Sequence, residues 1–178
     1  MRLLARLGSL HMVVAVLSAI TGLYMGMVVL NNLTDFGTNQ AFVRHVLAMD
    51  TTFESPNLMW RAITDPTLAD IAYFAIIVWE ALTAVALLGG FIAWVRALAG
   101  RTGTDTARRL STLGWLMQVL LFGGGFLAIG GEWFQMWQSA DWNGMDAAMR
   151  NVLLASVGII LAHLPNRETA PIEAGNRH

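Results

Sequence analysis

The sequence of 178 residues contains no cysteine and no lysine, and charged residues of any kind occupy only 13% of its positions. The absence of cysteine excludes disulfides, thiolate metal sites and cysteine nucleophiles. Soluble proteins carry charges at about 25% of positions, so this chain lacks the usual supply for a surface in water. Apolar residues instead reach 56%. This composition predicts a single-domain membrane protein.

Four apolar stretches are candidates for membrane-spanning helices, at about residues 9–30, 67–97, 111–137 and 147–164. At about 1.5 Å per residue the first three can cross a hydrocarbon core of about 30 Å. Asp65 and Pro66 form a start signal for the second. The fourth is long enough only if its helix includes residues before Arg150. We expect an all-α fold, with a four-helix transmembrane bundle over 1–164 and a polar cytoplasmic tail over 165–178.

The distribution of arginine predicts the orientation of the bundle. Eight of the eleven arginines lie near the chain termini or between positions 96 and 109, and three lie on the other side. Basic residues accumulate in the cytoplasmic segments of membrane proteins. We therefore expect both termini in the cytoplasm and residues 31–66 on the outer face.

The outer loop, residues 31–66, is too long for a bare connection and contains helix signals. Thr38 or Asn39 can cap a short amphipathic helix over 40–49, which would lie along the membrane surface. A proline in a first-turn position favours a second short helix over 56–64. The sequence therefore predicts a partly helical outer cap between the first two spanning helices.

Several segments carry a family resemblance: "NNLTDFGTNQAFVRHVLAMDTTF", "LMWRAITDP", "GGEWFQMWQSADWNG" and "AAMR". They resemble segments of a bacterial family of predicted small integral membrane proteins, a domain of unknown function. The resemblance covers roughly residues 8–163. It implies a multi-pass protein of the bacterial inner membrane with four helices, and it assigns no activity, cofactor or catalytic residue.

Glu80 is the sole acidic or basic residue between positions 71 and 94, and it lies about 15 Å along the helix from Asp70. Further polar candidates inside the membrane are Ser18, Thr21, Gln118 and Ser156. With no cation expected at this depth, desolvation favours the neutral acid, hydrogen-bonded to a hydroxyl or a carbonyl. Glu80 is thus an interhelical clasp, a proton- or ion-handling site, or a contact for a partner helix or polar ligand.

Four other ionisable residues lie near the expected membrane edges. Glu132 and Arg150 are expected to form an outer ion pair. His11 and His163 lie at similar depth near the cytoplasmic edge, where two facing imidazoles could ligate a haem iron, although hydrated histidines are common there. No other cofactor is expected. No metal site is expected either, because the remaining residues of metal-ligand type lack a recurring spacing.

Small residues predict where helices approach closely. The candidates for helix packing are Gly22, Gly26, Gly123, Gly124 and Gly125. Small side chains permit close backbone contact inside a membrane, where no hydrophobic effect drives helices together. Contacts within the bundle are the expected use, and contacts with an external partner are the alternative.

The sequence contains no phosphate-binding loop, dinucleotide fingerprint, H-E-x-x-H motif or G-x-S-x-G motif, and its scattered basic residues do not suit nucleic acid. The leading hypothesis is a non-enzymatic accessory or stabilising subunit of a larger complex. Its partners would be the lipid bilayer and either other membrane subunits or a second copy of itself. The alternatives are a small oligomeric proton or ion transporter or channel using Glu80, and a haem- or quinone-associated membrane anchor.

Overall fold

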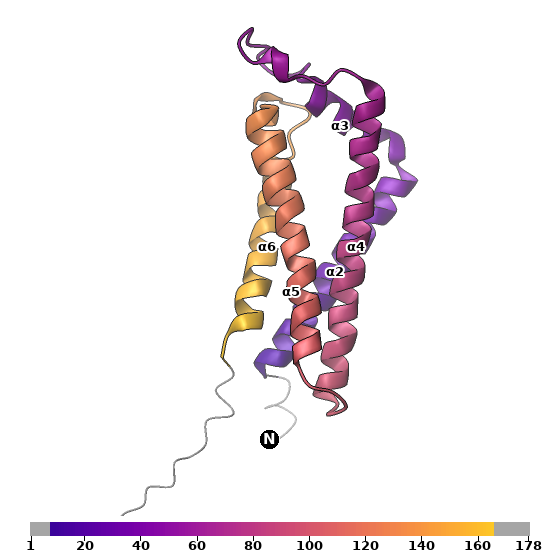
Figure 1. Ribbon diagram of the computed structural model, residues 1–178, viewed down its shortest axis with the longest axis vertical. Helices are drawn as coiled ribbons and strands as arrows, with labels where there is room; N and C mark the ends of the chain where they lie inside the picture. Colours follow the sequence, from indigo (N-terminus) through magenta and orange to yellow (C-terminus); the bar gives the residue numbers. More distant parts are fainter. Residues whose placement is uncertain (1–7, 166–178) are drawn as a thin grey trace, which may run out of the picture.

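A computed structural model describes residues 8–165, and these residues form helices joined by loops and turns, with no strand among them. The predicted all-α fold is therefore confirmed. Four long helical segments are long and apolar enough to cross a membrane, and they lie lengthwise beside one another (Figure 1). They are α2 (Leu10–Thr34), α4 (Pro66–Leu98), α5 (Asp105–Val119) with its continuation η2 (Leu120–Trp133), and α6 (Met145–His163). Most of the predicted tail over 165–178, and the arginines nearest the termini, lie outside the described residues.

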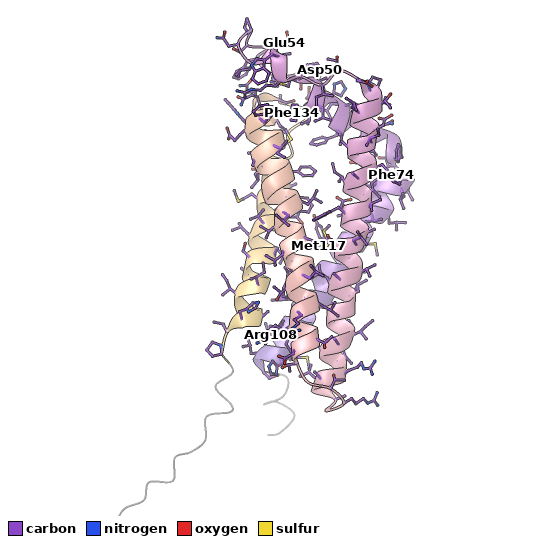
Figure 2. All side chains as sticks on the ribbon, viewed as in Figure 1. Asp50, Glu54, Phe74, Arg108, Met117 and Phe134 are labelled. Carbon is purple, nitrogen blue, oxygen red and sulfur yellow. The ribbon has the colours of Figure 1, made fainter. Side chains whose placement is uncertain are left out.

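The two ends of the bundle differ in how they are covered. One end carries α3 (Phe36–Ala48) and the short 3-10 turns η1 (Met59–Arg61) and η3 (Met136–Gln138). We call it the α3 end (Figure 1). Of the described residues, the opposite end holds the start of α2, the end of α6 and the short connection between α4 and α5. Asp50 and Glu54 lie at the α3 end, whereas Arg108 lies near the opposite end (Figure 2).

The outward faces of the spanning helices are apolar, as a hydrocarbon environment requires. Phe74 is 62% exposed, and its side chain points away from the bundle (Figure 2). Val85 on α4, Leu120 on η2 and Ile160 on α6 are exposed to a similar degree. In water such a surface would be a liability. In a bilayer it is the expected contact with lipid.

The ends of the helices follow their local sequence. The side chain of Asp65 accepts a hydrogen bond from the backbone N–H of Thr67 at 2.8 Å, and Pro66 occupies the first turn of α4. Asp105 lies in the first turn of α5, where its negative charge complements the helix dipole, and it pairs with Arg108 one turn later. α5 therefore begins earlier than the position 111 expected for the third helix.

The cap at the α3 end differs from the sequence expectation. α3 begins at Phe36, before the caps expected at Thr38 or Asn39. The second helix expected over 56–64 is reduced to the single turn η1. The physical reason is a backbone hydrogen bond from Ile63 N–H to Leu47 O at 2.8 Å, which ties the chain after η1 to the end of α3.

The second half of the third span, η2, is a π-helix, in which backbone bonds join residues five apart. The bond from Phe134 N–H to Ile129 O, at 3.0 Å, closes its last turn. Five glycines lie within η2, and their missing side chains relieve the crowding that otherwise favours an α-helix. The span ends at Trp133 rather than at the expected position 137.

Candidate functional site

Glu80 lies on the wall of a cavity of about 370 Å³, which we call the polar chamber. The chamber extends from Glu80 on α4 to Asn39 on α3 and to Asn143 in the connection before α6. Two of its lining residues are exposed, Asn143 at the α3 end and Tyr24 on the outer face of α2, so the walls of the chamber reach the surface at both places. The Glu80 side chain itself is only 3% exposed. A buried carboxyl group therefore lies on the wall of a cavity that both polar and apolar side chains line.

One oxygen of Glu80 is fixed by α2. Asn32 Nδ2 donates a hydrogen bond to Glu80 Oε2 at 2.6 Å, and Tyr73 Oη donates to the Asn32 backbone oxygen at 3.0 Å. The three residues are buried and link the end of α2 to the middle of α4. Glu80 Oε1 has no hydrogen-bond partner within residues 8–165. The carboxyl group is thus oriented on one side and available on the other.

A second polar group lies across the chamber on α6. Asn151 Nδ2 donates to Tyr24 Oη at 3.2 Å and to the Ala147 backbone oxygen at 2.9 Å. Gln118 Nε2 donates to Asn151 Oδ1 at 2.8 Å, whereas Gln118 Oε1 is buried without a partner within the described part of the chain. Asn151 and Tyr24 both line the chamber. Its hydrogen-bonding groups therefore come from α2, α3, α4, α6 and the connection before α6.

A second cavity, of about 340 Å³, adjoins the polar chamber, and we call it the apolar chamber. The two share Phe42, Val43, Ile76 and Phe126 as walls. The remaining walls come from α4, η2 and residues at the α3 end, and nearly all of the lining is apolar. Ile129, one of these walls, is 54% exposed on the outer surface of the bundle. The apolar chamber therefore lies between the polar chamber and the lipid-facing surface.

α3 forms the roof of both chambers through Phe42 and Val43. Arg44 on α3 makes a bidentate pair with Asp70 on α4, with N–O distances of 2.8 and 2.7 Å. Hydrogen bonding to Asp70 raises the pKa of the Arg44 guanidinium above its ordinary value. Both side chains are exposed, so salt weakens the pair. α3 is therefore attached to α4 by a contact that water reaches.

The other predicted polar candidates lie outside the polar chamber, toward the opposite end. Ser18 and Ser111 share a hydrogen bond of 2.6 Å, and Trp115 Nε1 donates to Thr21 Oγ1 at 3.1 Å. Ser156 is half-buried on α6 and makes no side-chain hydrogen bond within residues 8–165. Glu80 therefore bonds to none of these hydroxyls, and its partner is the amide of Asn32. Depth counted from helix ends ignores the tilt of α2 across the bundle (Figure 1), and Asn32, near the end of that helix, is the residue that reaches Glu80.

The expected ion pair between Glu132 and Arg150 is not formed. Within residues 8–165 the ion pairs are Arg44–Asp70, Arg108–Asp105 and, when the histidine is protonated, His45–Asp50. Glu132 and Arg150 are both exposed. The π-helical geometry of η2 changes the direction in which its last residues point relative to an α-helix, and the sequence alone does not indicate this.

His11 and His163 line the same cavity, of about 380 Å³, at the opposite end of the bundle. Each already has a contact: His11 stacks on Trp94 with ring centroids 5.3 Å apart, and His163 Nε2 hydrogen-bonds with Thr112 Oγ1 at 3.1 Å. Haem binding stays a prediction, which an absorbance spectrum of the purified protein tests. No cluster of three metal-ligand residues occurs in the described ranges.

The glycines that allow close packing are mostly not the predicted ones. A side-chain carbon added at Gly22 would lie 3.0 Å from Leu88, which fits a packing role, but Gly26 and Gly124 have no neighbour within 4 Å. A side-chain carbon added at Gly123 or Gly125 would lie at ordinary van der Waals distances from its neighbours, 3.5 and 3.7 Å. The tightest sites lie elsewhere: 2.4 Å at Gly158, and 2.5 Å at Gly90 and Gly114.

Asn32, Asn151, Tyr24 and Tyr73 were missed as site residues. A signal was present for Asn32 and Asn151, because an amide within an apolar spanning helix needs a partner inside the protein. Tyrosines give no such signal, since they are common near membrane interfaces.

Four long apolar segments with an apolar outer surface define a multi-span integral membrane protein. The comparison with known families agrees: the chain belongs to the family described as "Predicted small integral membrane protein", whose match covers residues 10–165. This description assigns no activity, ligand or partner. No curated protein and no solved structure matched the chain.

Proposed function

We propose that this protein is a small membrane carrier whose binding site is the polar chamber, and that Glu80 exchanges a proton there when ligand enters and leaves. The observation behind the proposal is the placement of Glu80, which lies on a cavity wall with one oxygen held by Asn32 and the other without a partner in the described structure. A carboxyl group that served only to join two helices would not need this cavity.

The free energies of hydrogen bonding and of membrane insertion favour the same interpretation. An interhelical hydrogen bond in a membrane contributes about 0.6 kcal/mol on average. An acidic residue at the centre of a spanning helix costs about 2.5–3.5 kcal/mol on insertion scales. The hydrogen bond to Asn32 therefore does not offset the free-energy cost of burying an ionised carboxyl group in the membrane. Glu80 rests as the neutral acid and ionises when a counter-charge arrives.

The packing of the opposite half supports a carrier rather than an open channel. Trp94, Trp115 and Leu87 are each at most 2% exposed and fill the interior between Glu80 and the His11 cavity. Gly114 and Gly158 bring neighbouring helices against Leu87 and Trp115. The site thus has access from the α3 end, and passage to the other end requires a second conformation.

The arginine distribution supplies the orientation in this proposal. With both termini in the cytoplasm of a bacterial cell, the α3 end lies on the outer face of the inner membrane. The polar chamber then opens to the periplasm in the conformation described here.

Modification with dicyclohexylcarbodiimide, an apolar reagent for protonated carboxyl groups, tests the proposal. Protein in lipid nanodiscs is treated across a range of pH and digested, and the modified carboxyl groups are located by mass spectrometry. The expected result is modification of Glu80 that decreases as the pH rises, because exchange with water deprotonates the group. Glu80→Gln should abolish this product, whereas Glu132→Gln should leave it unchanged. Modification of Glu80 that is absent at every pH would show an inaccessible clasp.

A second candidate, an accessory subunit of a larger membrane assembly, is favoured by exposed aromatic residues at the α3 end. Phe53 and Trp60 are 72% and 70% exposed, and they contact Trp137 and Trp133 at centroid distances of 6.0 and 5.6 Å. A photo-crosslinking residue at position 60 should then capture one defined membrane protein. Crosslinks to lipid alone would reduce this cluster to an interfacial anchor.

A further inference from the structure

We propose that the ligand of the polar chamber is a lipophilic organic cation, with an ammonium group beside Glu80 and an apolar portion in the adjoining apolar chamber. This assignment rests on the proposed function of the Glu80 site and names its ligand class.

The walls of the polar chamber suit an ammonium group. Five aromatic residues line it, and they are Tyr24, Phe42, Tyr73, Phe122 and Phe126. Aromatic faces attract cations, and quaternary ammonium groups are commonly recognised by aromatic cages. Glu80 adds a carboxyl group with one free oxygen. These are the two kinds of group that stabilise an organic cation away from water.

The charge of the lining decides between a simple organic cation and a phospholipid head group. No Arg, Lys or His occurs among the residues that line the polar chamber within 8–165. A phosphate placed there would lie beside an acid without a counter-charge, which is strongly unfavourable in a buried site. The ammonium group of a zwitterionic phospholipid brings such a phosphate with it. The chamber is therefore matched to a cation that carries no anionic group.

The apolar chamber supplies the remainder of the site. It shares Phe42, Val43, Ile76 and Phe126 with the polar chamber, so the two cavities lie on either side of these side chains. In this proposal one elongated molecule passes between them and occupies both cavities. Gly125 and Gly130 of η2 line it and contribute no side chain to fill it. Exposed Ile129 places this chamber next to the lipid-facing surface. An amphiphile dissolved in the bilayer can therefore reach the site from the side.

The exchange at Glu80 is balanced in charge. Neutral Glu80 releases one proton to the water at the α3 end as one cation binds, and the resulting carboxylate pairs with that cation. The other titratable groups of the described lining are the hydroxyls of Tyr24 and Tyr73. Both are engaged in the hydrogen bonds described above, and neither carries the positive charge that would oppose a cation.

Equilibrium binding to protein in nanodiscs tests the ligand class. Three probes share a dodecyl chain: dodecyltrimethylammonium, dodecylphosphocholine and dodecanol. Empty nanodiscs correct for partition into lipid. We expect saturable binding of dodecyltrimethylammonium, at least about tenfold weaker binding of the other two, and a similar loss for the cation in Glu80→Gln. Glu132→Gln, an exposed acid outside both chambers, should bind like the unaltered protein.

A second variant keeps the test informative if Glu80→Gln folds poorly. Gly125→Leu places a side chain in the apolar chamber, whereas Gly124→Leu alters a glycine that lines neither chamber. Gly125→Leu should weaken dodecyltrimethylammonium binding and spare tetramethylammonium, which has no chain. Gly124→Leu should affect neither.

Three results would overturn the ligand class: equal binding of dodecanol and the cation, cation binding that ignores both variants, or phosphocholine binding as strong as that of the simple cation. The last would indicate a lipid head group. Failure of this inference is distinct from failure of the proposed function. Carbodiimide reactivity of Glu80 without cation binding would reject only the ligand class, and cation binding without proton exchange would reject only the exchange.

Discussion

The two halves of the bundle are built from the same four helices, yet the interior around Glu80 is hollow, whereas the interior between Glu80 and the His11 cavity is filled. In the half at the α3 end, Glu80, Asn32 and Asn151 surround a cavity of about 370 Å³. In the opposite half, Trp115 lies against Gly158 so closely that a single added carbon would overlap it. The side chains around Glu80 leave space that water or a ligand can use, whereas Trp115 packed on Gly158 leaves none between those two helices. The difference agrees with the proposal that the open half binds a ligand, whereas the packed interior of the closed half holds the helices together.

The largest predicted effect concerns the closed half. A side-chain carbon at Gly158 would lie 2.4 Å from Trp115 Cε2, far inside the 3.5–4.0 Å at which carbon atoms attract. Gly158→Val should therefore lower the free energy of unfolding by about 3 kcal/mol, at the upper end for overpacking. Unfolding in mixed micelles, followed by circular dichroism, measures this. Gly124→Ala, with no neighbour within 4 Å, should change stability by less than about 0.5 kcal/mol, and equal losses would remove the contrast between the halves.

The next effect concerns the border between the halves, where Gln118 donates to Asn151. Gln118→Leu leaves Asn151 Oδ1 without its donor, so stability should fall by about 1–3 kcal/mol. The double variant Gln118→Leu, Asn151→Leu removes both partners and should cost less than the sum of the single changes. A double-mutant cycle by denaturation measures the coupling. Strictly additive losses would contradict a paired role.

A smaller effect on stability is expected in the open half. Glu80→Gln keeps an oxygen that accepts from Asn32, so the free energy of unfolding should change by about 0.6 kcal/mol or less. Ligand binding and carbodiimide reactivity should nevertheless be lost. Thermal unfolding measured beside ligand binding separates the two roles. A large loss of stability would show that the carboxyl group mainly joins the helices.

The smallest effect is expected at the roof of the open half. Arg44→Gln removes the exposed pair with Asp70, so the midpoint of unfolding should shift slightly at low salt and not at all at high salt. Hydrogen exchange of α3 should accelerate while that of α4 stays unchanged. A shift that persists in high salt would indicate a role beyond the ion pair.

Much of the fold could be predicted, because spanning helices depend on local composition and length. The four spans, the start of α4 at Pro66 and a helix in the outer loop follow from short stretches of sequence. The π-helical form of η2 could not be predicted, since the choice between bonding patterns depends on packing around its glycines. The helix expected over 56–64 failed because a distant bond, from Ile63 to Leu47, competes with local preference.

The candidate site was only half predictable. Glu80 stands out in the sequence because it is isolated in an apolar run, but the partners expected for it are hydroxyls, such as Ser18, Thr21 and Ser156, or backbone carbonyls. The residue that binds it is Asn32, near the end of a tilted helix. Counting residues gives distance along one helix and says nothing of its tilt or rotation against another.

The sequence by itself determined that this chain crosses a membrane, roughly where its helices lie, and that one acid is buried among them. Those properties depend on the transfer of local segments from water to lipid, which composition controls. Only the tertiary structure decided that Glu80 meets Asn32, that two chambers adjoin beneath α3, and that Gly158 rather than Gly124 admits a neighbouring side chain. These depend on how the helices tilt and turn against one another, and many distant contacts together set that arrangement.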